Sequence, residues 1–199
     1  MKLEHIPLKG SVLQLQPFAP DLKEEVRAAV DCDPETWAIT PVNPMGDGFD
    51  LYWSAACGAP PGERMAYAIR RRSDNRVIGM STFYTSLVGQ GGVSIGTSFI
   101  HPSVRGGAAN PAAKLLMLDH AFKCGAVRVS VDTRNKRSQA AVAKLGATRE
   151  GVLRRDRLTW TGYIRDTVVF SILDQEWPEL KARLQARVEG LIKADLTKL

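Results

Sequence analysis

The sequence predicts an α+β domain (an α/β three-layer arrangement), in which helices cover both faces of a mixed, mostly antiparallel central sheet of about seven strands. Two observations carry this prediction. Stretches with strand-like alternation at residues 65–71, at 77–84 and from Val93 onward follow one another across short turns, as hairpin-linked strands do. A glycine-rich loop and a helix come next, so the following strand, residues 127–131, should return parallel to the strand at Val93.

The remaining elements follow from periodicity, capping residues and turn signals. Residues 8–16 alternate as a first strand, and residues 89–92 form a glycine-rich turn before Val93. Residues 147–156 and 163–173 read as two closing antiparallel strands. The expected main helices are 21–30 capped by Asp21, 111–124 opened by Asn110 and Pro111 and stopped by Gly125, 136–145 capped by Asn135 and stopped by Gly146, and 178–195 after Asp174.

Residues 1–175 are expected to form one domain, and residues 176–199 a C-terminal helix that packs on it or extends it. Within the domain, residues 31–62 form an irregular insert, because proline and glycine repeatedly interrupt any period, with a short helix over 49–57. We interpret this insert as a lid over a substrate site; the alternative is a packed irregular connection.

Composition narrows the class of protein. The 199 residues hold enough apolar residues for a core, but no run approaches the ~18 needed to cross a membrane. Three dispersed cysteines, Cys32, Cys57 and Cys124, indicate free thiols in a reducing cytoplasm, and the histidines show no metal-binding spacing. The net charge of +6 suits an acidic partner, yet few aromatics and no long basic run argue against nucleic acid.

The glycine-rich loop after the strand at Val93 is the first candidate for a site. It reads R-G-G-A-A from Arg105 to Ala109 and leads into Asn110-Pro111. A strand, a glycine-rich turn and a helix N-terminus together direct backbone N–H groups and a helix dipole at phosphate. The alternative is an ordinary tight turn that needs glycine for its backbone alone, with Arg105 as a solvated cation.

Two segments together resemble the GNAT superfamily of acetyl-CoA-dependent N-acetyltransferases, in particular the branch of ribosomal-protein and other protein N-terminal acetyltransferases. Residues 95–110, I-G-T-S-F-I-H-P-S-V-R-G-G-A-A-N, are similar to the pyrophosphate loop of that family. Residues 135–151, N-K-R-S-Q-A-A-V-A-K-L-G-A-T-R-E-G, are similar to its N-x-x-S helix and the strand after it. Ala108 stands where the family usually has glycine, Asn110 where it usually has glycine or alanine, and Ser94 where the branch often has a glutamate.

The resemblance implies transfer of an acetyl group from acetyl-CoA to a primary amine of a protein N-terminus or a small molecule. Asn135 and Ser138 would act in the site, the amide holding cofactor or water and the hydroxyl donating near the sulfur. Trp37, Trp53 and Tyr84 are candidate substrate contacts. The residues expected to bind the cofactor are Val104, Arg105, Gly106, Gly107, Ala108, Ala109 and Asn110, together with Asn135 and Ser138.

The general base stays open. His101, at the end of the strand, has a suitable ordinary pKa and is included among the catalytic candidates, although a structural role before Pro102 is the simpler interpretation. Tyr84, Asp132 and Glu150 are further candidates. For each of Asn135 and Ser138 the alternative is also structural, an N-cap and a surface serine.

Two other functions compete. One is a non-catalytic acyl-CoA-binding or sensing module on the same fold, suggested by Ser94 and by the altered loop. The other is a dinucleotide-binding domain, because Asp132 ends the strand after the loop; the missing G-x-G-x-x-G pattern counts against it. The acceptor is not specified by the sequence, and a homodimer is compatible with it.

Overall fold

The computed structural model describes residues 3–60, 62–85, 92–122 and 126–196. Its centre is one eight-stranded sheet in the order β1-β2-β3-β4-β5-β6-β8-β7. Among the described strands only β5 and β6 pair in parallel, which confirms the predicted mixed, mostly antiparallel sheet. The strands are β1 (Leu8–Lys9), β2 (Leu13–Pro17), β3 (Arg64–Arg71), β4 (Val77–Tyr84), β5 (Gly92–Ile100), β6 (Ala126–Asp132), β7 (Thr148–Leu158) and β8 (Ile164–Ile172).

The eighth strand arises because the predicted first strand folds back on itself. The chain turns after Lys9, and β1 pairs antiparallel with β2, with Leu8 opposite Leu15. A sheet in which parallel pairing is confined to β5 and β6 among the described strands is not the parallel sheet that a dinucleotide-binding domain needs. That alternative is therefore wrong.

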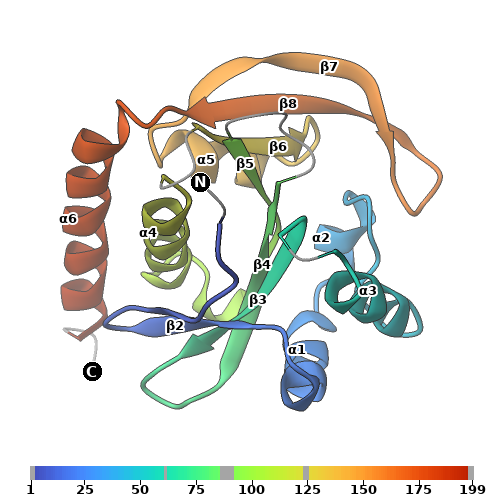
Figure 1. Cartoon of the computed structure of the whole chain (residues 1–199), viewed down its shortest axis with the longest axis horizontal. Helices are drawn as coiled ribbons and strands as arrows, with labels where there is room; N and C mark the ends of the chain where they lie inside the picture. Colours follow the sequence, from blue (N-terminus) through green and yellow to red (C-terminus); the bar gives the residue numbers. More distant parts are fainter. Residues whose placement is uncertain (1–2, 61, 86–91, 123–125, 197–199) are drawn as a thin grey trace.

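Helices cover both faces of the sheet (Figure 1). On one face α4 and α6 pack over the sheet in the larger core, which contains Tyr67, Phe83 and Met117, and α5 closes a smaller core against β6 and β8. On the other face α1, α2 and α3 pack on Ala68 and Phe99 in the second core. The helices are η1 (Pro20–Leu22), α1 (Lys23–Val30), α2 (Pro34–Ala38), α3 (Gly48–Cys57), η2 (Pro102–Val104), α4 (Ala109–Ala121), α5 (Lys136–Ala143) and α6 (Trp177–Leu196).

Two predicted helix caps are wrong. Asp21 does not cap α1, because the chain first makes the short 3₁₀ turn η1 and Leu22 takes the N-cap position. Asn110 does not cap α4, because that helix begins two residues earlier than predicted, at Ala109, with Ala108 at the N-cap and no side-chain hydrogen bond there. The predicted turn at residues 89–91, Cys124 and the stop at Gly125 lie outside the described residues. Cys32 and Cys57 are free, exposed thiols.

Candidate functional site

The parallel pair at the middle of the sheet separates part-way along. β5 and β6 pair from Gly92 opposite Ala126 to Ile95 opposite Val129, and no further pair follows although both strands continue. On its outer side β5 stays paired with β4 as far as Ile100, and β6 stays paired with β8 as far as its last residue. The split between the two strands is therefore wedge-shaped, and the backbone groups on its two inner edges have no partner strand.

A backbone irregularity marks the apex of this split. Thr97 has φ +43°, a left-handed value that is strained for a β-branched residue, and the register of β4 and β5 shifts between Met80 and Thr82. The Tyr84 hydroxyl holds the irregular strand through a 2.6 Å hydrogen bond with the Thr97 hydroxyl. Backbone strain of this kind often accompanies a functional site, which makes the apex of the split a candidate site. Nothing in the sequence pattern of β5 predicted the irregularity.

The loop after β5 ends in an open helix N-terminus. The N–H groups of Val104 and Arg105 donate within the 3₁₀ turn η2, to His101 and Pro102. In the described part of the chain, those of Gly106 to Asn110 have no hydrogen-bond partner. Gly106 has φ +84° in open space, so glycine is needed there for its backbone conformation. Five adjacent free donors and the positive end of the α4 dipole make an anion site.

Arg105 does not extend freely into solvent beside these donors. Its guanidinium forms an ion pair of 2.6 Å with Asp33, donates to the Ile100 carbonyl at 2.8 Å and lies 5.1 Å from the centre of the Phe99 ring. Asp33 in turn accepts from the N–H of Thr36 as the N-cap of α2. The cation expected to bind phosphate therefore also attaches the insert to the strand end.

The helix on the other side of the split, α5, begins as predicted. Asn135 is its N-cap, and its side-chain oxygen accepts from the Ser138 N–H at 2.9 Å. The amide nitrogen of Asn135 has no hydrogen-bond partner among the described residues. The Ser138 hydroxyl is half-buried and also has none there. Both groups keep a donor for a ligand in addition to the structural role of Asn135.

The short helix α2 joins both sides of the split. Besides the ion pair between Asp33 and Arg105, the Thr36 hydroxyl accepts from Arg137 of α5 at 2.6 Å. The carbonyl of Trp37 accepts, at 2.8 Å, from the indole N–H of Trp160, which lies at the tip of the β7–β8 hairpin. A five-residue helix thus touches the loop after β5, the helix after β6 and the last hairpin.

The two predicted tryptophans of the insert lie in the core. Trp37 is 1% exposed, stacks on Phe99 and donates from its indole nitrogen to the Val30 carbonyl. Trp53 is buried and stacks on Phe18. Their role as substrate contacts stays a prediction, one that this packing does not support, whereas Tyr84 lies at the apex of the split.

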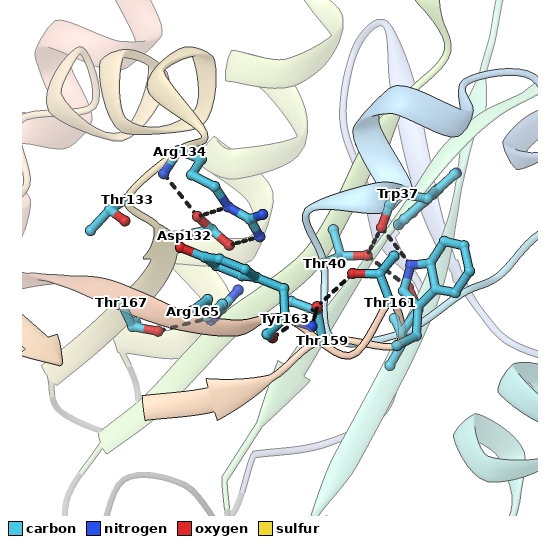
Figure 2. A network of polar contacts seen from close by, with 12 residues as sticks. Trp37, Thr40, Asp132, Thr133, Arg134, Thr159, Thr161, Tyr163, Arg165 and Thr167 are labelled. Atoms are coloured by element: carbon cyan, nitrogen blue, oxygen red, sulfur yellow. Dashed lines mark hydrogen bonds and ion pairs between the residues drawn. The ribbon is translucent and has the colours of Figure 1, made fainter. Parts of the chain in front are cut away.

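The candidate bases differ in their surroundings. Asp132 is buried and its two carboxylate oxygens accept from Arg134, whose guanidinium also lies 3.8 Å from the centre of the Tyr163 ring (Figure 2). Burial alone would raise the pKa of Asp132, but the Arg134 hydrogen bonds outweigh it and the pKa is lowered, which makes this carboxylate a weak base. Glu150 pairs with Ser171 on β8, and the His101 ring is turned onto Ser103.

Sequence reasoning also missed a buried lysine on α4. The Lys114 amine donates to the Ser98 hydroxyl at 2.6 Å and to the Ser81 hydroxyl at 3.1 Å, on the face of the sheet under the apex. Burial lowers the pKa of Lys114 to about 7. A signal was present in the sequence, because Lys114 precedes the buried Leu118 by four residues and so shares its face of the helix.

Comparison with known proteins agrees with this geometry. The family model described as an acetyltransferase (GNAT) domain matches residues 13–148. The chain belongs to the GNAT acetyltransferase family. GNAT proteins transfer acetyl groups, and their fold binds acetyl-CoA or CoA. Among the described residues no helix is long and apolar enough to cross a membrane, and no group of three or more acidic, histidine or cysteine side chains could hold a metal ion.

Solved structures of GNAT proteins resemble the whole chain. A protein from T. thermophilus assigned to the acetyltransferases is 34% identical, with a TM-score of 0.79 over 91% of this chain and 96% of that one. A GCN5-related N-acetyltransferase from Brucella melitensis is 23% identical, with a TM-score of 0.85 over 94% and 87%. RimJ of Mycobacterium smegmatis, solved with CoA-disulfide, is 23% identical, with a TM-score of 0.74 over 90% and 92%. A search of curated proteins gave no match.

Proposed function

We propose that this GNAT protein is an N-acetyltransferase that moves an acetyl group from acetyl-CoA to a primary amine, by direct attack while both are bound. The amine belongs to a protein N-terminus or to a small molecule. The observation that carries the proposal is the split between β5 and β6, with the open N-terminus of α4 at its mouth. When bound, acetyl-CoA supplies the thioester that is the acyl donor.

The residues present fit this cofactor. The five free N–H groups from Gly106 to Asn110 match an anionic pyrophosphate, which needs several donors and a positive potential. The inner edges of β5 and β6 offer unpaired backbone groups to an extended, amide-containing chain, much as they would to another strand. The Asn135 amide nitrogen and the Ser138 hydroxyl add donors from the opposite side of the split.

The chain contributes to the reaction by positioning and by hydrogen bonding. Two reactants held in one site react as if unimolecular, which supplies much of the rate. The Ser138 hydroxyl is assigned the donor role near the leaving sulfur, and the Tyr84 hydroxyl, at the apex, is assigned to relay the proton from the amine. Ser94 is buried on the strand next to Tyr84 and has no carboxylate to act as a base.

Binding and turnover test this proposal separately. Millimolar CoA should raise the melting temperature of the parent protein, and a panel of amines with acetyl-CoA should release free CoA thiol. Ser138→Ala should keep the CoA-induced shift and lose roughly tenfold to a thousandfold in rate. A missing CoA shift would overturn the assignment. CoA binding without turnover of any amine would instead favour the non-catalytic acyl-CoA-binding module that the serine at position 94 suggests.

A further inference from the structure

Arg64, the first residue of β3, is a cation without a counter-ion in the described part of the chain. Its guanidinium carbon lies 5.1 Å from the centre of the Tyr52 ring and 5.7 Å from that of the Tyr84 ring. No carboxylate oxygen of the described residues lies within 4.0 Å of a guanidinium nitrogen of Arg64, the distance limit for an ion pair. Its Nε and Nη2 atoms and the nearby hydroxyl of Thr82 are buried without a hydrogen bond of standard geometry, and the Tyr52 phenol is the neutral polar group that lies close to both.

Arg70, at the other end of the same strand, shows how unusual this is. Arg64 contacts Tyr52 of α3 and Arg70 contacts Glu25 of α1, so both side chains lie on the sheet face that α1, α2 and α3 cover. Each of the three guanidinium nitrogens of Arg70 has a hydrogen-bond partner. It forms two hydrogen bonds with the Glu25 carboxylate, at 2.8 and 2.9 Å, and others with Gln16 and the Asn75 carbonyl. The third arginine of β3, Arg71, pairs with Asp74. Of the three arginines of this strand, Arg64 is therefore the one left unpaired in the described chain.

Leaving a buried guanidinium unpaired is unfavourable. A buried polar group without a partner is destabilising, and more so if it is charged. The two tyrosine rings recover part of that cost through cation–π attraction, which leaves the positive charge in place. Burial raises the pKa of Tyr52, so this phenol stays neutral beside the guanidinium and does not neutralise it. The charge therefore remains available to an anionic ligand.

A pocket provides the space for such a ligand. It has a volume of about 740 Å³ and lies between the N-terminal segment, the end of α3 and the start of β3, with Arg64, His5, Phe18 and Cys57 in its wall. The third guanidinium nitrogen, Nη1, has no hydrogen bond to the described residues and, unlike Nε and Nη2, is not fully buried. Glu4 also borders the pocket, but its carboxylate is outside ion-pair distance of Arg64.

The register of the sheet relates this pocket to the apex of the split. Arg64 is paired with Tyr84, and Tyr84 with Ser94 on β5, one residue before the last pair of β5 with β6. Arg64 and Ser94 are thus two strand spacings apart, roughly 9–10 Å. We propose that the acceptor is an amine that also carries a carboxylate, which binds Arg64 while the amine reaches the apex. This inference rests on the proposed N-acetyltransferase function and adds the chemical class of its acceptor.

The test compares matched ligands that differ only in the anionic group. Straight-chain ω-amino acids of about four to eight carbons span the required spacing, and the primary amide of each is the neutral counterpart. Binding to the CoA-saturated parent protein is measured by calorimetric titration. We expect the acid to bind at least about tenfold more tightly than its amide at the best length, and Arg64→Gln to remove that preference.

Two further variants exclude trivial explanations. Arg76→Gln removes the same charge from the exposed turn at the opposite end of the β3–β4 hairpin and should keep the preference for the acid. Arg64→Lys keeps the charge and should retain part of it. Equal binding of acid and amide by the parent at every length overturns the inference, whether or not the variants fold, and so does a preference that survives Arg64→Gln.

The outcome also separates this inference from the proposed function. If neutral amines are acetylated and the acids have no advantage in binding, the acceptor class is wrong and the acetyltransferase stands. If the acids bind with the expected preference and no amine is acetylated, Arg64 is an anion site and the proposed function fails. The CoA-induced melting shift of Arg64→Gln, compared with the parent, shows that the variant is folded.

Discussion

The two helices that flank the split begin in opposite ways. α5 starts with Asn135, whose side chain accepts from the N–H of Ser138, and the Lys136 N–H donates to the Arg134 carbonyl, so the chain itself satisfies part of its first turn. α4 starts at Ala108 with no side-chain cap, and the N–H groups before and within its first turn are free in the described structure. A helix that leaves its N-terminal donors open beside a glycine-rich loop is prepared for an external acceptor, whereas a capped helix is not.

The sequence did not distinguish these two helix starts. Asn110 and Asn135 are the same residue type, each before a helical pattern, and each was predicted to be an N-cap. The helix of Asn110 begins two residues earlier than predicted, at Ala109, so this side chain lies within the first turn instead of capping it. The difference between an anion site and a closed helix end is therefore two residues of helix register, from a predicted N-cap at Asn110 to an observed one at Ala108.

The largest expected effect concerns CoA. A ligand at a hundred times its Kd stabilises the folded state by about 2.7 kcal/mol, which should appear as a melting shift of the parent. Asn110→Asp places a carboxylate among the open donors and should remove most of that shift. The matched change Asn135→Asp, at the capped end, should weaken the shift less. An unchanged shift in Asn110→Asp would mean that α4 does not bind the anion.

A second effect concerns the buried amine of α4, which α5 lacks. Lys114 has a pKa lowered to about 7 in the folded protein, from an unfolded value of 10.5, so the unfolded chain binds more protons between these values. Stability should therefore rise with pH above 7, by about 1–2 kcal/mol up to pH 8.5. Urea unfolding at both pH values checks this, and Lys114→Met should lack this increase.

The caps themselves should differ by a smaller amount. Asn135→Ala removes the hydrogen bond to the Ser138 N–H and should lower the free energy of unfolding by about 0.5–2 kcal/mol. Asn110→Ala removes no cap and should stay within about 0.5 kcal/mol of the parent. Chemical denaturation of the two variants in parallel, without CoA, compares the two helix ends directly. Equal losses would mean that Asn110 stabilises α4 in some other way.

The smallest effect belongs to Arg105. Its ion pair with Asp33 is partly exposed, and its loss in Arg105→Ala should cost about 1 kcal/mol or less. The same change should weaken CoA binding more at low than at high salt, because a charge contribution is screened over roughly 10 Å at 0.1 M salt. Equal weakening at both salt concentrations, measured by titration, would assign Arg105 to packing alone.

The sequence predicts those features that depend on neighbouring residues, and it does not predict those that depend on residues far apart in the chain. Local patterns located the strands β4 and β6 and the cap at Asn135, because alternation and capping are properties of neighbouring residues. The strained backbone at Thr97 and the unpaired guanidinium of Arg64 were not predictable, since both depend on segments that meet only in the folded sheet. The same is true of Trp37, whose burial depends on its contact with Phe99.

The way in which α2 is held has a consequence for the rate of ligand exchange. Its polar contacts to Arg105, Arg137 and Trp160 are individually weak and could break one at a time. The packing of Trp37 is stronger, because its buried aromatic ring anchors α2 in the second core. Moving α2 away from the sheet would therefore open that core. Such local unfolding is slower than the movement of a loop. We therefore expect the cofactor to enter and leave past α4 while α2 stays in place.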